Sequence, residues 1–206
     1  MNVRHPPGRA GRPWLVHRLE VAQRGAELLD DKHRALLRER ARLQPEVARA
    51  RERWERQARD AERWAIRAAL LGGERQMAIS AAIAPAHATV TVRWRTVLGV
   101  TCPADAEVQD VPGSELPPGA SAALMEAAQA HRRAAEAAAQ VGVAERALSL
   151  VESDLRSTSL RRNAIRHRWI PAHEQALAAL TATLEELERE DGARVRSIVR
   201  RQGATI

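Results

Sequence analysis

The sequence of 206 residues contains neither phenylalanine nor tyrosine, and only one cysteine, Cys102. Globular cores of this size normally use aromatic side chains to fill their volume, so their scarcity argues against one large core. A lone cysteine excludes a disulfide within the chain and suits a reducing compartment. The longest uncharged run, residues 77–92, contains Pro85 and is too short to span a bilayer, and the first residues lack the apolar segment of a signal peptide. We therefore expect a cytoplasmic protein.

Signatures of catalysis and of metal binding are also missing. No H-E-x-x-H and no glycine-rich phosphate loop occurs, and Lys32 follows no such loop. The seven histidines are scattered, and His167 and His173 are six residues apart, the wrong spacing for a shared metal on one helix face. The sequence thus predicts a protein that is not an enzyme, with no catalytic residue, cofactor or metal site.

A 3-4 apolar spacing runs from Leu15 to Leu71 almost without interruption. A seven-residue apolar period is typical of a coiled coil, because these side chains stay on one seam of a supercoiled helix. A helix of this length spans roughly 85 Å, whereas a compact domain of this size has a radius of about 17 Å. The helix therefore needs a partner along its seam. Its seam positions are Leu15, Leu19, Ala22, Ala26, Leu29, His33, Leu36, Arg40, Leu43, Val47, Ala50, Trp54, Gln57, Ala61, Trp64, Ala68 and Leu71.

The second half of the chain supplies that partner, since the same spacing runs from Val141 to Ile165 and resumes from Leu177 to Ile198. Between these stretches the steps lengthen to four, four and four, close to Pro171, which indicates local unwinding. The simplest fold is mainly α: a long antiparallel two-helix coiled coil formed by the N- and C-terminal helices.

The middle of the chain has a different period. Residues 90–95 alternate apolar and polar side chains, as in a strand, and Pro103 is expected to end the run that follows. A short second strand near residues 107–111 would close a β-hairpin, and Ser121 is a suitable N-cap for the next helix. The predicted organisation is residues 1–85 as the first long helix, 86–119 as the hairpin and loop insert, and 120–206 as the second long helix.

Positive charge is concentrated near both termini of a chain whose net charge is +7. If Leu15 lies level with Ile198 and Leu71 with Val141, the numbers of paired residues sum to about 213. Residues 1–20 would then lie beside residues 192–206 and form a purely basic tip. This tip is either a solvated or frayed helix end or a surface that enters an acidic protein sleeve or binds a polyanion. The same pairing places Pro45 opposite residues 168–171, which predicts a shared bend.

Four segments, in order along the chain, resemble motifs of the D subunit of the V-type (A/V-type) ATPases. They are the R-G-x-x-L-L-x-x-K-x-x-A-L pattern of residues 24–36, the L-G-V-x-x-P pattern of 98–103, residues 158–171 with their N-A-I and I-P segments, and the acidic-basic run 185–194. The matched motif residues are Arg24, Gly25, Lys32, Gly99, Pro103, Arg161, Asn163 and Pro171. The sequence departs from the family where Arg166 replaces a glutamate and where Arg168 and Trp169 replace small apolar residues.

This resemblance implies a central-stalk rotor subunit of a V-type ATPase or ATP synthase. It would transmit rotation between the ion-translocating rotor in the membrane and the catalytic A/B hexamer. The partners implied are the A and B subunits, the F subunit and the socket formed by the C subunit, with no nucleic acid and only indirect membrane contact. We expect the hexamer to contact the basic tip, through Arg12, Trp14, Arg18, Arg194, Arg196, Arg200 and Arg201.

Two alternatives fit parts of the sequence. A stand-alone basic coiled-coil scaffold or nucleic-acid-binding protein would explain the charge, but it has no use for the hairpin insert. The γ shaft of F-type enzymes also has two long helices, but it carries a larger α/β domain, for which residues 86–120 are too few.

Overall fold

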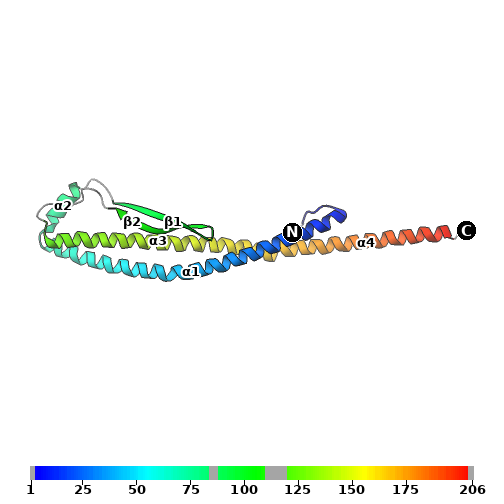
Figure 1. The fold of residues 1–206 in the computed structure, drawn as a ribbon, viewed down its shortest axis with the longest axis horizontal. Coiled ribbons are helices and arrows are strands. Elements are labelled where there is room, and N and C mark those ends of the chain that lie inside the picture. Colours follow the sequence, from blue (N-terminus) through cyan, green and yellow to red (C-terminus); the bar gives the residue numbers. More distant parts are fainter. Residues whose placement is uncertain (1–2, 84–87, 110–119, 204–206) are drawn as a thin grey trace. The chain divides into compact units, whose positions relative to one another are not determined.

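The computed structural model describes residues 3–83, 88–109 and 120–203. The fold is mainly helical, with two long antiparallel helical segments that pack together and a β-hairpin between them in the sequence, as predicted (Figure 1). The elements are η1 (Gly8–Ala10), α1 (Gly11–Leu70), α2 (Gly73–Ile83), β1 (Thr89–Val97), β2 (Val100–Gln109), α3 (Ala122–Ala164), η2 (Ile165–Trp169) and α4 (Ile170–Gly203).

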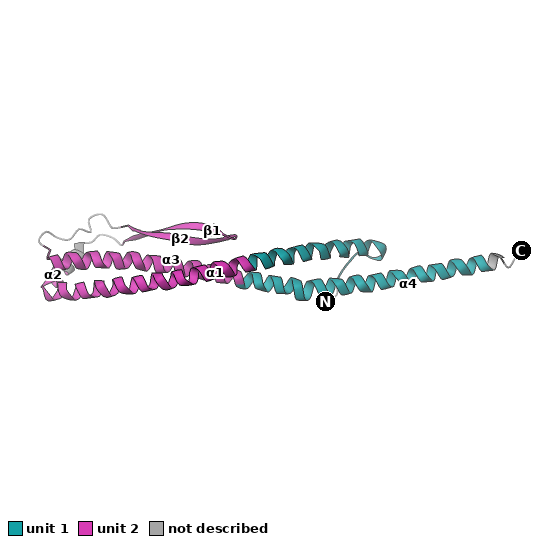
Figure 2. Ribbon diagram, turned by 60° about the horizontal axis from the view of Figure 1, so that its bottom comes forward, with its two compact units in different colours: residues 1–33, 156–206 teal, residues 34–155 magenta. Residues whose placement is uncertain are grey.

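Two compact units divide the chain, and each combines segments from both halves of the sequence (Figure 2). Unit 1 contains residues 1–33 and 156–206, and unit 2 contains residues 34–155. This composition follows from antiparallel pairing, because residues near the two ends of the sequence then become neighbours.

The predicted seam of α1 is the buried side of that helix. Leu36 and Leu43 pack in one cluster of unit 2 with Val151 and Leu155 of α3, and Ala50, Ala61 and Ala68 continue the buried stripe. The only polar positions in the predicted stripe, His33, Arg40 and Gln57, are half-buried. The seven-residue period therefore identified most of the packed face correctly, but the predicted seam residues Trp54 and Leu71 are 38% and 69% exposed.

The pairing register differs from the prediction. In unit 2, Arg51 pairs with Glu145, and Arg133 lies 3.8 Å from Asp60, so paired residue numbers sum to about 195 rather than about 213. The reason is an alanine stripe that precedes Val141. Its positions continue the 3-4 spacing toward the start of α3, and the first three are buried, so the seam begins about five turns earlier than predicted. The stripe consists of Ala123, Ala127, Ala130, Ala134 and Ala137.

This register also separates the two prolines that were predicted to face each other. In unit 2, Pro45 lies inside α1 a few residues before Arg51, the partner of Glu145. In unit 1, Trp169, two residues before Pro171, lies under the guanidinium of Arg18. The predicted pairing of Pro45 with residues 168–171, and with it the shared bend, is therefore wrong.

The lengthened spacing before Leu177 corresponds to a turn of π-helix, η2. The backbone N–H of Ile170 donates to the carbonyl of Ile165, five residues earlier. A π turn holds one more residue than an α turn, so it absorbs the extra residue in the 4-4-4 spacing. It ends two residues before Pro171, whose ring would crowd the carbonyl four residues before it in a regular α-helix.

The β-hairpin forms as predicted, but its second strand begins earlier. Val97 pairs with Val100 across a two-residue turn, in which Leu98 and Gly99 have φ values of 54° and 79°. Glycine tolerates this left-handed conformation, whereas leucine adopts it at a cost. Pro103 does not end a strand; it lies inside β2 next to an irregularity of the register, where a missing N–H is tolerated. Of the strand predicted near residues 107–111, positions 110 and 111 lie outside the described residues.

Contacts from β2 attach the hairpin to the helices of unit 2, and the ribbon runs alongside α3 in Figures 1 and 2. Cys102 inserts into the cluster around Leu36, and burial raises the pKa of its thiol. Gln140 of α3 donates 2.8 Å hydrogen bonds to Asp105 and to the carbonyl of Ala106. The bonds from Gln140 and from Arg93 lower the pKa of Asp105. Its stabilising contribution is therefore complete above the pKa of the unfolded chain and is lost as the pH falls through the lowered value.

The ends of the long helices have local causes. After α1, Gly72 adopts a φ of 80°, and a Cβ on Gly73 would lie 2.7 Å from the carbonyl oxygen of Ala68. Both glycines are therefore suited to the break, and α2 is a separate helix rather than a continuation of α1.

At the start of α3, the N–H of Leu124 donates to the hydroxyl of Ser121 at 3.2 Å, which confirms the predicted N-cap.

Candidate partner-binding surface

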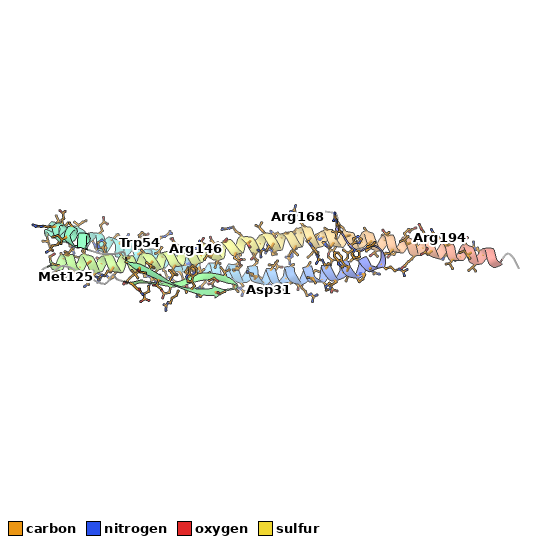
Figure 3. All side chains as sticks on the ribbon, turned by 90° about the horizontal axis from the view of Figure 1, so that it is seen from above. Asp31, Trp54, Met125, Arg146, Arg168 and Arg194 are labelled. Carbon is orange, nitrogen blue, oxygen red and sulfur yellow. The ribbon has the colours of Figure 1, made fainter. Side chains whose placement is uncertain are left out.

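The last turns of α4 extend past the start of α1 within unit 1 (Figures 2 and 3). A Cβ on Gly11, the first residue of α1, would lie 2.9 Å from the side chain of Leu180. Arg9, just before α1, forms an ion pair with Glu188 at 3.2 Å. Beyond these contacts, α4 continues to Gly203, and no other described helix of unit 1 lies opposite that extension. We call residues 189–203 the α4 extension.

An exposed apolar stripe runs along the end of α4. Leu187, Val195, Ile198 and Val199 are 51%, 60%, 56% and 62% exposed. Their spacing places them on one side of the helix, over about a third of its circumference. Such a stripe normally packs against another element. The periodic seam continues here without its partner helix, so this face is available for another protein.

Arginines surround the stripe. Among the described residues, Arg194 contacts acidic groups only within its own helix, at 3.9 Å to Glu190 and 3.8 Å to Asp191. Arg196 and Arg200 are exposed, and the side chain of Arg201 lies outside the described residues. The α4 extension therefore presents apolar and positively charged groups together, which suits a partner surface that is both apolar and acidic.

The predicted single basic tip is not formed. Arg12 and Arg18 lie near the start of α1, which packs beside η2 and the first half of α4. Arg196 and Arg200 lie on the α4 extension, as does Arg194, which Figure 3 labels. The cause is the shifted register, which moves the C-terminal arginines beyond the N-terminal ones. The α4 extension alone is the strongest candidate among the predicted partner-binding residues.

Trp14 and Arg18 contribute to packing inside unit 1. The guanidinium of Arg18 lies 5.3 Å from the ring centre of Trp14 and 5.8 Å from that of Trp169, within the range of cation–π attraction. Trp169 stacks on His173, which is buried and donates from Nδ1 to the Trp169 carbonyl at 2.9 Å. The carbonyl can only accept, so Nδ1 carries the proton. Through this cluster the first turns of α1 pack against the π turn η2.

The motif residues do not converge on one site. Gly99 and Pro103 belong to the hairpin of unit 2, and the other six motif residues belong to unit 1. Arg24 is exposed and bonds to the carbonyl of Glu20, while Asn163 accepts hydrogen bonds from its neighbour Arg162. Within residues 3–83, 88–109 and 120–203, no three His, Cys, Asp or Glu side chains are placed to hold a metal ion. The motif residues are thus distributed along helices and turns rather than around a reaction centre.

Two features of this surface were not predicted from the sequence. Val195 and Val199 were not recognised as part of the exposed stripe, although their i, i+4 spacing beside Ile198 is visible in the sequence. That the stripe lacks a partner could not be inferred without the register.

Among the described helices, none is both long enough and apolar enough to cross a bilayer.

Comparison with known proteins finds similarity over nearly the whole chain. Residues 15–200 match the family of ATP synthase D subunits. The chain is 32% identical to the D subunit of the V-type ATP synthase of Anaeromyxobacter sp. strain Fw109-5 over 199 residues, covering 94% of this chain and 92% of that protein. It is 28% identical to the D subunit of the A-type ATP synthase of Methanopyrus kandleri, covering 89% and 81%. It is 31% identical to the V-type D subunit of Thermus thermophilus, covering 87% and 81%.

Proposed function

Because this chain belongs to the family of ATP synthase D subunits, we propose that it is the central-stalk rotor subunit of a V-type ATPase or ATP synthase. It is a non-catalytic subunit of such a complex. In the proposed role it transmits rotation between the ion-translocating rotor in the membrane and the catalytic A/B hexamer. The further proposed partners are the F subunit and the socket formed by the C subunit. The protein would be cytoplasmic and attached to the membrane only through the complex.

The observation that carries this proposal is the α4 extension. In the described part of unit 1 its apolar stripe packs against no other helix, and Arg189 and Arg194 pair with acidic residues of α4 itself. The surface of the α4 extension differs from one side to the other, because the stripe covers only part of the circumference. We propose that this asymmetric helix enters the hexamer. Each catalytic subunit would then meet a different surface at each angle of the shaft. A conformational change requires such a difference in interaction free energy between states.

Native mass spectrometry of the chain co-expressed with the A, B and F subunits of its source tests this proposal. We expect one copy of this chain per A/B hexamer, with the F subunit bound. A free dimer that ignores the hexamer and shifts DNA at low salt would replace the proposal with the basic scaffold. The hairpin and the family match both favour the rotor subunit.

Gly25 provides a more local prediction. It lies inside α1, yet an added Cβ would meet nothing within 4 Å, and the same is true of Gly142 in α3. Glycine inside a helix costs about 0.5–1 kcal/mol relative to alanine. We therefore expect Gly25→Ala and Gly142→Ala each to stabilise the isolated chain by about that amount in urea unfolding.

The two substitutions are expected to differ in the assembled complex. Gly25 belongs to a family motif, and a close approach of a partner's backbone would explain a glycine that this chain's own packing does not require. Gly25→Ala should then reduce the fraction of assembled complex in native mass spectra, and Gly142→Ala should not. Equal effects of both substitutions on assembly would contradict a partner contact at Gly25.

A further inference from the structure

A groove in unit 2 lies between the hairpin and the two long helices. Its volume is about 650 Å³, and it is lined by residues of α1, α3, β1 and β2. A second cavity of about 800 Å³ adjoins it and shares Ala50, Arg53, Arg56 and Gln140. The first volume is in the range of small-molecule sites, about 300–1,000 Å³. None of the partner contacts proposed above has been assigned to this groove.

Four arginines line the first cavity. Arg49, Arg53 and Arg56 follow one another at i, i+4 and i+7 on α1, which places them on one side of the helix. Arg95 comes from β1, on the hairpin side of the groove. Like charges at i, i+4 repel one another. An anion bound between them would relieve that repulsion.

The acidic groups of this cavity are already engaged by other cations. Glu46 pairs with Arg42 at 2.7 Å, and Glu52 pairs with Arg56 at 2.6 Å. Within the described part of the chain, Arg49 and Arg53 form no ion pair and no side-chain hydrogen bond. Two guanidinium groups at the same wall of the groove are therefore available.

Arg95 is only weakly engaged. Its guanidinium lies 3.7 Å from Glu39, a carboxylate that Arg42 already holds with bonds of 3.0 and 2.7 Å. The hydrogen bonds from Arg42 are the main reason that the pKa of Glu39 is lowered. Arg95 can turn toward a groove ligand while Glu39 keeps its stronger partner.

The adjoining cavity is less suited to an anion, because Asp105, Glu107 and Glu136 line it. Asp105 pairs with Arg93 there. The first cavity instead has an apolar base, with Leu43, Val143 and Pro103 among its lining residues. Four arginines line each cavity, but the first has two carboxylates, Glu46 and Glu52, against three in the adjoining one. The first cavity therefore has the larger excess of positive charge, around Arg49, Arg53 and Arg95.

We propose that this arginine groove binds a polyphosphate group, carried by free inorganic polyphosphate or by a nucleotide. Guanidinium groups bind phosphate oxygens through paired, charge-assisted hydrogen bonds. A polyphosphate chain places several negative charges within the reach of neighbouring arginines, more densely than the separate carboxylates of an acidic peptide. Arg49, Arg53 and Arg95 hold the phosphates, and the apolar base lies beneath any organic part of the ligand.

Isothermal titration calorimetry of the full chain with inorganic tripolyphosphate, in about 150 mM salt, tests the proposal. We expect saturable binding with one ligand per chain. R49Q/R53Q should weaken it about tenfold or more, since two charge-assisted contacts are lost. R196Q/R200Q is the matched control: it removes the same charge at the same helical spacing on the α4 extension and should change the affinity less than about twofold. Circular dichroism establishes that both variants are folded.

Titration with ATP separates the two sources of the ligand. Tighter binding of ATP than of tripolyphosphate would assign the groove to nucleotides, and equal binding would assign it to the phosphate chain alone. Equal losses in both double variants would overturn the proposal in favour of non-specific attraction to a basic protein. Absence of binding, or tighter binding of hexaglutamate than of tripolyphosphate, would also overturn it. The experiment uses the isolated chain, so its outcome is independent of the proposed rotor function.

Discussion

Deleting residues 192–206 is expected to leave the isolated chain folded but to change the ATPase rate of the assembled complex by about fivefold or more. The described part of this segment packs against no other described element of unit 1, and the last ion pair to the N-terminal region is that of Glu188. Its removal should therefore cost little stability. The same segment carries Val195, Ile198 and Val199 of the exposed stripe and the arginines that we propose as contacts with the hexamer.

Two measurements separate these effects. Urea unfolding followed by circular dichroism should give nearly the same free energy of unfolding for the full and the shortened chain. ATPase assays of the reconstituted complex should show that the shortened chain changes the rate of ATP hydrolysis. An unchanged ATPase rate in a complex that contains the shortened chain would contradict the proposed role of the α4 extension.

Two substituted chains of full length refine this test. V195S/I198S/V199S removes the apolar stripe, and R194Q/R196Q/R200Q removes the charge. Burial of apolar surface supplies most of the affinity of such contacts, whereas charge complementarity mainly sets the orientation and rate of association. We therefore expect the first variant to reproduce more of the change in ATPase rate that the deletion causes. A larger effect of the arginine variant would identify charge as the main coupling contact.

Leu36→Ala is expected to destabilise the chain by about 2–5 kcal/mol. Leu36 is 0% exposed, in a cluster with Val151, Leu155 and Cys102 that joins α1, α3 and the hairpin. Truncation leaves a cavity where two helices and a strand meet, and close packing prevents the neighbours from filling it fully. Urea unfolding measures the loss.

Leu28→Ala is the matched control, because it makes the same chemical change on the same helix. Leu28 is 70% exposed. Its truncation should alter the free energy of unfolding by no more than about 0.5 kcal/mol. Similar losses from both substitutions would mean that the face of α1 that carries Leu36 is not its packed face.

The packed face of α1 could be predicted from the sequence, because leucine at regular 3-4 spacing stands out against charged neighbours. The register could not. In the first part of α3 the seam is made of alanines such as Ala123 and Ala130, and exposed alanines such as Ala135 surround them. Hydrophobicity hardly distinguishes a buried from an exposed alanine, so the true start of the seam was hidden.

The hairpin, too, could be predicted from the sequence only in part. Alternation in residues 90–95 identified β1, but the turn at Leu98–Gly99 was hidden because leucine seldom adopts positive φ. Pro103 suggested a strand end, since the irregular register that accommodates it leaves no mark in the sequence. The candidate site depended on the register, so the sequence grouped the arginines of both termini, whereas the structure separates those of α1 from those of the α4 extension.

The π turn at Ile165–Trp169 fixes the angular setting of everything that follows it in unit 1. Each added residue advances an α-helix by about 100°. Without the wider turn, one extra residue would rotate the α4 extension by that angle and aim its apolar stripe elsewhere. A shortening by one residue within η2 could be absorbed by closing the π turn to an α turn, whereas the same loss after Leu180 could not. If the chain acts as the proposed shaft, this short segment would set which face of the α4 extension meets a given catalytic subunit at each angle of rotation.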